Sequence, residues 1–342
     1  MYKIALSNLN ELYKAISAEC PLYLPIKKAG EVNYAFYEDG AEVSLNTLRT
    51  VKSPKDCFFP QSEDLVKFKV DGQKIEVIDI REQAKPFVVM GVRACDYQAF
   101  AVLDRVFLVD PLDTYYATKR EAGIVITHAC SKPDESCFCH AFGVDATNPL
   151  GDITIWTVGE YLYWRANTEK GSALTQKLAG LLVEDGEEAV KKQQEEVKAI
   201  YAKLPLANLD LSTFAEGDMM ELFNSDKWQA LSEACMGCGT CTFVCPTCQC
   251  FDIREFVTNS AVKRFRCWDS CMYSDFTKTA GGQPRTTQTQ RFRQRFMHKL
   301  VYYPENNDGM YSCVGCGRCV KKCPQSLNIV KVIKAFGGKK DE

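Results

Sequence analysis

Two cysteine-rich segments in the C-terminal third constrain this chain more than any other feature. Each contains four cysteines in the spacing Cys-x-x-Cys-x-x-Cys-x-x-x-Cys, followed directly by a proline. The first segment runs from Cys235 to Pro246 and the second from Cys313 to Pro324. This spacing is typical of bacterial proteins with two [4Fe-4S] clusters, in which three cysteines of a run bind one cluster and the fourth binds the other.

The crossed arrangement predicts the ligands of both clusters. Cluster 1 is expected to be bound by Cys235, Cys238, Cys241 and Cys323. Cluster 2 is expected to be bound by Cys313, Cys316, Cys319 and Cys245. Glycines between these cysteines let the backbone wrap closely and turn its N–H groups towards sulfur. Paired Cys-x-x-Cys motifs also bind zinc, but two complete four-cysteine runs favour iron and sulfide.

Four further cysteines lie between the two runs, and we refer to them as candidate cluster 4. Cys248 and Cys250 follow the first run directly, and Cys267 and Cys271 enclose a Trp-Asp-Ser segment. Two interpretations are open. The thiols bind another cluster, with Asp269 as a substitute ligand, or they are buried and inert beside clusters 1 and 2.

A second group of four cysteines lies in the N-terminal half, and we refer to it as candidate cluster 3. It consists of Cys95, Cys130, Cys137 and Cys139. The first two follow apolar strands predicted over Pro86–Met90 and Gly123–Thr127, so a parallel sheet would place them at its carboxyl edge, where ligands collect. The pattern favours a further iron–sulfur cluster. Zinc binding with His128 or His140, and simple packing of the thiols, are the alternatives.

The pattern of apolar residues predicts an α+β protein with three parts. Residues 1–165 are expected to form a mixed α/β domain, in which Tyr97–Leu108 has helical spacing and could link the two apolar strands as a βαβ unit. Residues 166–205 are expected to form a helical connector, interrupted near Gly186 and ended by Pro205. Residues 206–342 are expected to form a two-[4Fe-4S] ferredoxin-like domain.

Composition narrows the class of protein. The formal net charge of −2 does not suit a nucleic-acid-binding protein. With 18 cysteines in 342 residues and no secretory leader, the chain is expected to be cytoplasmic, where thiols stay reduced. No apolar run is long enough for a membrane span. Gly-x-Gly-x-x-Gly and phosphate-binding loop motifs are absent from the sequence, and we predict no catalytic residue.

One basic segment, Arg285–Lys299, contains Arg291, Arg293, Arg295 and His298 with interleaved phenylalanines. It is expected either to steer an acidic redox partner or to form a solvated helix whose phenylalanines cover the clusters.

Several segments resemble a family of iron–sulfur subunits of anaerobic sulfite reductase, a group that also includes the beta subunits of cytoplasmic sulfhydrogenases. In the C-terminal half they are Cys241-Thr-Phe-Val-Cys-Pro-Thr-Cys-Gln-Cys-Phe-Asp, Trp268-Asp-Ser-Cys, Ala280-Gly-Gly, Arg293-Gln-Arg, His298-Lys299 and Cys313-Val-Gly-Cys-Gly-Arg-Cys. In the N-terminal half they are Phe58-Phe-Pro-Gln, Gly91-Val-Arg-Ala-Cys-Asp and Cys137-Phe-Cys139.

The resemblance implies a non-catalytic electron-transfer subunit of an anaerobic oxidoreductase of the sulfite reductase, hydrogenase or transhydrogenase type. Its expected partners are a flavoprotein subunit that binds FAD and NAD(P), and a catalytic or ferredoxin-accepting subunit. The resemblance also implies one or two clusters beyond the first two. Cys267 matches the family pattern less well, which implies a non-cysteine fourth ligand in candidate cluster 4. A free-standing ferredoxin-like carrier and a redox sensor with structural clusters are the alternatives.

Overall fold

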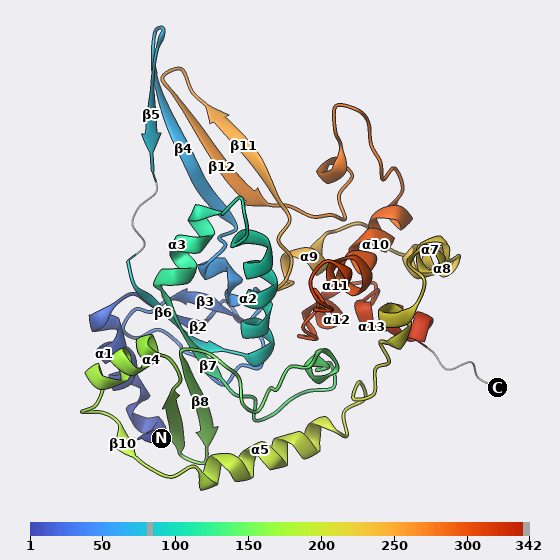
Figure 1. Cartoon of the computed structure of the whole chain (residues 1–342). Helices are drawn as coiled ribbons and strands as arrows, with labels where there is room; N and C mark the ends of the chain where they lie inside the picture. The colour runs from blue at the N-terminus through green and yellow to red at the C-terminus, as the bar shows by residue number, and fades with distance from the viewer. Residues whose placement is uncertain (81–84, 338–342) are drawn as a thin grey trace, which may run out of the picture.

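The computed structural model of the chain describes residues 1–80 and 85–337. Within these residues the strands form two sheets, an eight-stranded mixed sheet and a four-stranded antiparallel sheet (Figure 1). The C-terminal part is largely helical. No helix in the described ranges has the length and apolar character needed to cross a membrane.

The large sheet forms the N-terminal domain and has the strand order β10-β1-β9-β8-β7-β6-β2-β3. Its strands are β1 (Tyr2–Ala5), β2 (Leu22–Lys28), β3 (Glu31–Phe36), β6 (Phe87–Val92), β7 (Gly123–His128), β8 (Ile153–Val158), β9 (Tyr161–Ala166) and β10 (Val183–Glu184). The central strands β2, β6, β7 and β8 are parallel to their neighbours in this group. Every residue of β6 is buried, as the uninterrupted apolar sequence predicts.

The predicted βαβ unit is confirmed. Strands β6 and β7 pair in parallel, and the helices α2 (Ala94–Phe107) and α3 (Thr114–Ala122) lie between them in the chain. Helix α2 starts directly after β6, and its buried face packs on the phenylalanine-rich side of the sheet. The order of elements therefore brings the starts of α2 and of the loop after β7 to the same edge of the sheet.

The segment 166–205 differs from the expected connector. Helix α1 (Leu9–Glu19) and helix α4 (Glu169–Lys177) both contribute to the core of the large sheet, and β10 pairs with β1. Only helix α5 (Glu188–Tyr201) runs from the sheet towards the C-terminal helices, and in Figure 1 it lies along the bottom of the molecule. Apolar residues in 169–182 pack on the sheet, so this stretch belongs to the N-terminal domain.

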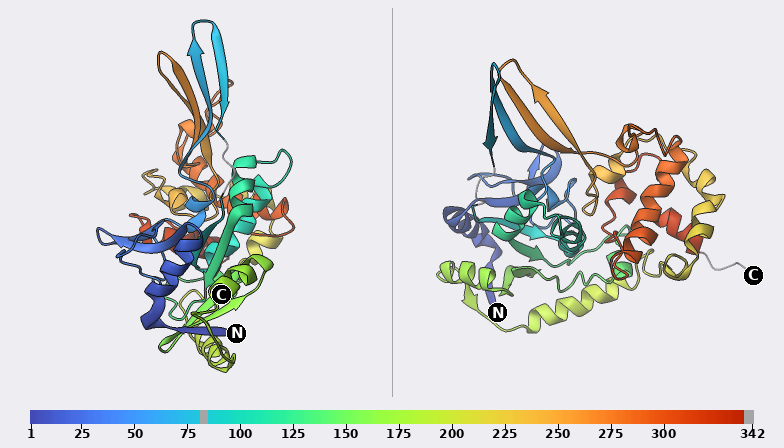
Figure 2. Two further views of the ribbon diagram at one scale, coloured as in Figure 1. Left: turned by 90° about the vertical axis from the view of Figure 1, so that its left-hand side faces the viewer. Right: turned by 45° about the horizontal axis from the view of Figure 1, so that its top comes forward.

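The four-stranded sheet joins the two halves of the chain, which the predicted domain boundaries did not anticipate. It has the order β11-β12-β4-β5 and consists of β4 (Ser62–Asp71), β5 (Lys74–Asp79), β11 (Phe251–Val257) and β12 (Ala261–Trp268). The central pair β12–β4 is antiparallel and connects residues that are about 200 positions apart. Figures 1 and 2 show the sheet projecting from the body as an arm.

The C-terminal domain packs helices around a second apolar core. Its helices are α6 (Ser212–Glu216), α7 (Met219–Asn224), α8 (Lys227–Ser232), α9 (Thr240–Phe243), α10 (Gln288–Met297), α11 (Tyr303–Glu305), α12 (Arg318–Lys322) and α13 (Ile329–Gly337). Short 3-10 helices occur as η1 (Leu6–Asn8), η2 (Pro54–Cys57), η3 (Cys139–Phe142) and η4 (Asp275–Thr277), and η5 (His298–Tyr302) is a π-helix. Helix α10 begins with a capping box at Thr287 and Gln290, which fixes its start next to the first cysteine run.

Candidate iron–sulfur sites

The two cysteine runs adopt the same backbone conformation. Gly237 and Gly315 have φ values of +67° and +59°, and Gly239 and Gly317 have φ values of +72° and +74°. These left-handed conformations suit glycine, because a Cβ atom would be strained there. A short helix begins at Gly239 in one run and at Gly317 in the other, so the third cysteine of each run lies in the first turn of a helix.

The predicted ligands of cluster 1 line one cavity. Its wall contains Cys235, Cys238, Cys241 and Cys323, together with Met272, Phe292, Phe296 and Arg295. The structure therefore brings the fourth cysteine of the second run to the first run, as the crossed arrangement requires. Cys238 is exposed, and Met236 beside it is 63 % exposed. This cavity consequently opens to the surface of the domain.

Arg295 gives this cavity a positive charge. Its side chain is 3 % exposed, and one of its nitrogens, Nη2, donates to the carbonyl oxygen of Cys241 at 3.2 Å. Among the described residues its Nε and Nη1 atoms have no hydrogen-bond partner. Burial opposes the charge of Arg295, but nearby thiolates, first that of Cys241, hold its pKa well above the ordinary value. A buried cation is costly without a counter-charge, and the thiolate-bound cluster that fits this cavity would supply one.

Replacing Arg295 by methionine is expected to make cluster 1 harder to reduce. At an effective dielectric constant of 20 and a separation of roughly 7 Å, one charge contributes about 2 kcal/mol, or on the order of 90 mV for one electron. A redox titration followed by EPR would measure the shift to lower potential. Arg293→Met is a matched control, because Arg293 lies on the same helix but stacks on the ring of Phe223. Equal potentials in the two variants would contradict this role.

The predicted ligands of cluster 2 gather around a buried lysine. The thiol of Cys313 interacts electrostatically with Lys299, Cys319 and Cys245, and that of Cys316 with Cys245 and Cys319. Lys299 Nζ donates at 2.8 Å to the hydroxyl of Thr247 and at 2.8 Å to the carbonyl oxygen of Ser312. Thr247 and Ser312 neighbour ligands from different runs. Lys299 therefore connects the two runs.

The basic segment Arg285–Lys299 matches the second expectation in part, because its phenylalanines cover the cysteines but three of its basic side chains are not solvated. Arg291, Arg295 and Lys299 are buried, at 9 %, 3 % and 3 % exposure, instead of facing solvent or a partner. The phenylalanines of the segment do cover the cysteines, since Phe292 and Phe296 line the cluster 1 cavity. Arg295 and Lys299 interact with nearby thiolates. Arg291 instead donates to the side chain of Gln288 and to the carbonyl oxygen of Arg285.

The cysteines of candidate cluster 3 come together in one buried group with Tyr201. The group contains Cys130, Cys137 and Cys139, with Cys95 packed against them. Cys95 lies at the start of α2 and Cys130 follows β7, at the carboxyl edge of the parallel strands as predicted. Burial raises the pKa of Cys139 to about 12 and that of Cys137 to about 11, so binding of metal has to release their protons.

Of the two histidines considered for a zinc site, one has both ring nitrogens in other contacts and one does not. His128 is buried, and its two ring nitrogens contact the Leu45 carbonyl oxygen at 3.2 Å and the Thr157 hydroxyl at 3.0 Å. His140 Nε2 contacts the carbonyl oxygen of Ala207 at 3.0 Å, while its Nδ1 is buried and has no hydrogen-bond partner among the described residues. In residues 1–80 and 85–337, no three His, Cys, Asp or Glu side chains are close enough to hold a single metal ion. All four members of the group are cysteines, the residue type that binds iron–sulfur clusters.

Candidate cluster 4 is brought together only in part. Cys250 and Cys271 are hydrogen-bonding neighbours, and Cys248 lies against Cys245 of cluster 2. Cys267 is on strand β12 between two buried residues, so its side chain points to the opposite face of the sheet. There it interacts with Arg254, Asp252 and Asp269. The structure thus separates Cys267 from the other three cysteines.

Several buried cations around the cysteines have no signal in the sequence. Lys55 donates to the carbonyl oxygen of Cys248 at 2.7 Å and lies 4.0 Å from the centre of the Trp268 ring. Arg318 forms a buried ion pair with Asp96, next to Cys95. Arg49 contacts Cys137 and Cys316. Lys55 and Arg49 are single basic residues outside any motif, and only the fold places them beside the thiols. Arg318 lies within the second cysteine run, but its ion pair with Asp96 is a long-range contact.

Comparisons with known proteins agree with this geometry. Residues 234–327 match the family model described as a 4Fe-4S dicluster domain. Over 328 residues the chain is 32 % identical to sulfhydrogenase 2 subunit beta of Pyrococcus furiosus, and the match covers 94 % of each chain. Because the match leaves out only about 6 % of the chain (100 % minus 94 %), it extends over candidate cluster 3, the arm and the first cysteine run.

Proposed function

Because this chain belongs to the sulfhydrogenase beta-subunit family, we propose that it relays electrons between a flavoprotein subunit that binds FAD and NAD(P) and a catalytic or ferredoxin-accepting subunit. The match supports an iron–sulfur subunit of an oxidoreductase, and the role proposed for it is electron transfer and not catalysis. A bound cubane takes up and gives back one electron at a potential set by charge, hydrogen bonds and exposure. The protein supplies these three factors.

One observation carries the proposal: the cysteine groups adjoin one another from the N-terminal domain to the surface of the C-terminal domain. Cys95, in candidate cluster 3, interacts electrostatically with Cys316 of cluster 2. Cys319 of cluster 2 interacts in the same way with Cys241 of cluster 1. Cys238, a predicted ligand of cluster 1, is exposed, so this end of the series lies at the surface. A series of neighbouring sites with one exposed end suits a relay better than a single redox centre.

The ligands that we propose fall into three groups. They are Cys235, Cys238, Cys241 and Cys323 for cluster 1, Cys313, Cys316, Cys319 and Cys245 for cluster 2, and Cys95, Cys130, Cys137 and Cys139 for cluster 3. For candidate cluster 4 we retain Cys248, Cys250 and Cys271 with a ligand other than Cys267. All eighteen cysteines, which lie within the described residues, are free thiols, and this suits work in the reducing cytoplasm.

Iron analysis tests the number of clusters. The anaerobically purified protein is expected to contain about twelve irons or more per chain, because each cubane holds about four. Cys139→Ser is expected to lower this number by about four and to remove one EPR signal of the reduced protein. Cys20→Ser is the control, since Cys20 lies at the end of α1, away from the groups described above. A wild-type content of about eight irons would contradict cluster 3.

Isolation from the native host tests the relay. The chain is expected to co-purify with a flavoprotein, and NAD(P)H is expected to reduce its clusters in that complex but not in the separated chain. A monomer that is fully active as a diffusible carrier would contradict the subunit role. Clusters that do not reduce reversibly at low potential would favour a sensor instead.

A further inference from the structure

The loop of candidate cluster 3 and the second cysteine run are packed together without space between them. The Phe138 N–H donates to the Gly315 carbonyl oxygen at 3.3 Å. A Cβ atom at Gly315 would lie 2.4 Å from the carbonyl oxygen of Phe138, and one at Gly317 would lie 2.5 Å from that of Ser136. Gly315 and Gly317 shape the loop of cluster 2. Because they have no Cβ atom, they also leave room for the loop of cluster 3.

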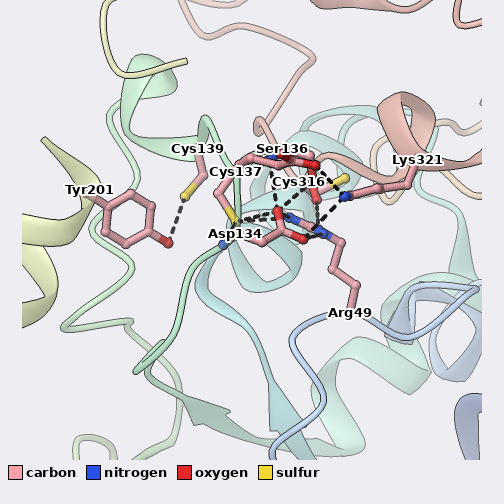
Figure 3. A network of polar contacts seen from close by, with 9 residues as sticks. Arg49, Asp134, Ser136, Cys137, Cys139, Tyr201, Cys316 and Lys321 are labelled. Atoms are coloured by element: carbon pink, nitrogen blue, oxygen red, sulfur yellow. Dashed lines mark hydrogen bonds and ion pairs between the residues drawn. The ribbon is translucent and has the colours of Figure 1, made fainter. Parts of the chain in front are cut away.

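Arg49 connects the two loops with hydrogen bonds (Figure 3). Its Nε donates to the Cys316 carbonyl oxygen at 2.6 Å, and its Nη2 donates to Cys137 Sγ at 2.9 Å. The side chain of Arg49 is 13 % exposed, so solvent competes little for these bonds. One guanidinium group therefore contacts a predicted ligand of cluster 3 and the main chain of a predicted ligand of cluster 2.

Asp134 fixes the orientation of Arg49. Its carboxylate accepts one hydrogen bond from Nη1 and one from Nη2, both at 2.7 Å. The same carboxylate accepts from the N–H of Ser136 at 2.9 Å and from its hydroxyl at 2.7 Å, which holds the loop that carries Cys137. The same carboxylate thus holds both the guanidinium group of Arg49 and the loop of Cys137. A planar guanidinium can make these contacts at once, whereas an ammonium group cannot reproduce the fork.

We propose that Arg49 is a positioning residue that sets the separation and contact between clusters 3 and 2, and with them the rate of electron transfer between the two. The inference rests on the proposed function. The step moves one electron: one site is oxidised, the other is reduced, and no bond forms or breaks. The N–H···S bond to Cys137 also favours the reduced state at that site, because it stabilises the added negative charge.

The variants R49K and R49M test this role against R105M. Arg105 is the matched control, because it also joins the two halves of the chain, through an exposed ion pair with Asp308 at 2.8 Å. Iron and acid-labile sulfide would first be measured in each holoprotein. The chain would then be mixed anaerobically with less than one equivalent of dithionite, and the transfer of the electron between EPR signals would be followed by rapid freezing.

We expect R49K and R49M to keep their iron and to equilibrate more slowly by about tenfold or more, since small misplacements have effects of this size. R49M is also expected to titrate at lower potential than the wild type at cluster 3. R105M is expected to match the wild type in both measurements. A wild-type rate and potential in both Arg49 variants would overturn the inference. A wild-type chain without an N-terminal cluster would instead overturn the proposed function, and the wild-type iron content reveals this before any variant is made.

Discussion

Replacing Arg318 by methionine is expected to lower the free energy of unfolding by about 3–5 kcal/mol, as is usual when one partner of a buried ion pair is removed. Arg318 lies between two predicted ligands of cluster 2. Its guanidinium contacts both carboxylate oxygens of Asp96 at 2.5 and 2.8 Å, and the two side chains are 3 % and 2 % exposed. Without Arg318, the Asp96 carboxylate would be left buried beside Cys95. Because Arg318 lies among the predicted ligands of cluster 2 and Asp96 is next to Cys95 of cluster 3, the change affects both of these clusters.

Denaturation of the holoprotein under argon, followed by tryptophan fluorescence, would measure this loss. The double variant Arg318→Met, Asp96→Leu is expected to regain a large part of it, because no buried charge remains. Arg105→Met serves again as the control, since its exposed ion pair should contribute only about 0–1 kcal/mol. If Arg318→Met were as stable as Arg105→Met, the ion pair between Arg318 and Asp96 would not stabilise the contact between the N-terminal and C-terminal halves of the chain.

Replacing Gly315 by alanine is expected to cost about 2–5 kcal/mol and to separate the loops of clusters 2 and 3. About 1–2 kcal/mol comes from the left-handed backbone, whose φ is +59°. About 1–3 kcal/mol more comes from overpacking, because the new Cβ atom would meet the backbone of Phe138 and Cys139 at 2.4–2.6 Å. Backbone atoms in a packed loop cannot move aside as a flexible side chain can.

Gly237 provides a symmetric control for this prediction. It has the same place in the first cysteine run and a φ of +67°, but a Cβ atom there would meet only the side chain of Gln288, at 3.1 Å. Gly237→Ala should therefore carry the backbone strain alone, about 1–2 kcal/mol. The difference between the two variants in the midpoint of unfolding, and in the EPR signal of cluster 3, measures the contact between the loops. If the two variants had the same midpoint of unfolding and the same EPR signal, the contact between the loops would contribute nothing to stability.

The cysteine runs and the central strands could be predicted from sequence because their signals are local. A fixed spacing identifies the two runs, and uninterrupted apolar segments identify β6 and β7. Parallel pairing of those strands then places Cys95 and Cys130 at one edge. These arguments need no knowledge of contacts between distant segments.

The other features could not be predicted, because they depend on contacts between distant segments or on which face of a strand a side chain occupies. Cys267 is close in sequence to Cys271, but it lies on a strand that the sequence did not reveal, and neighbouring residues of a strand point to opposite faces. The arm pairs β4 with β12, about 200 positions away, and a pattern within one segment does not show which strand pairs with it. Arg49 is 267 positions from Cys316. No pattern within a window of residues relates the two.

The strands of the arm come from both halves of the chain, and this affects folding during synthesis, which proceeds from the N-terminus to the C-terminus. Strand β4 leaves the ribosome long before β12, and at about 5–20 residues per second the missing strand follows roughly ten to forty seconds later. During this interval β4 has β5 on one side and an open edge on the other, and Ile75 and Val77 of β5 are more than 60 % exposed even in the finished protein. An open apolar edge is a template for association with other chains. We therefore expect newly made chains to present the unpaired edge of β4 until their C-terminal half has emerged.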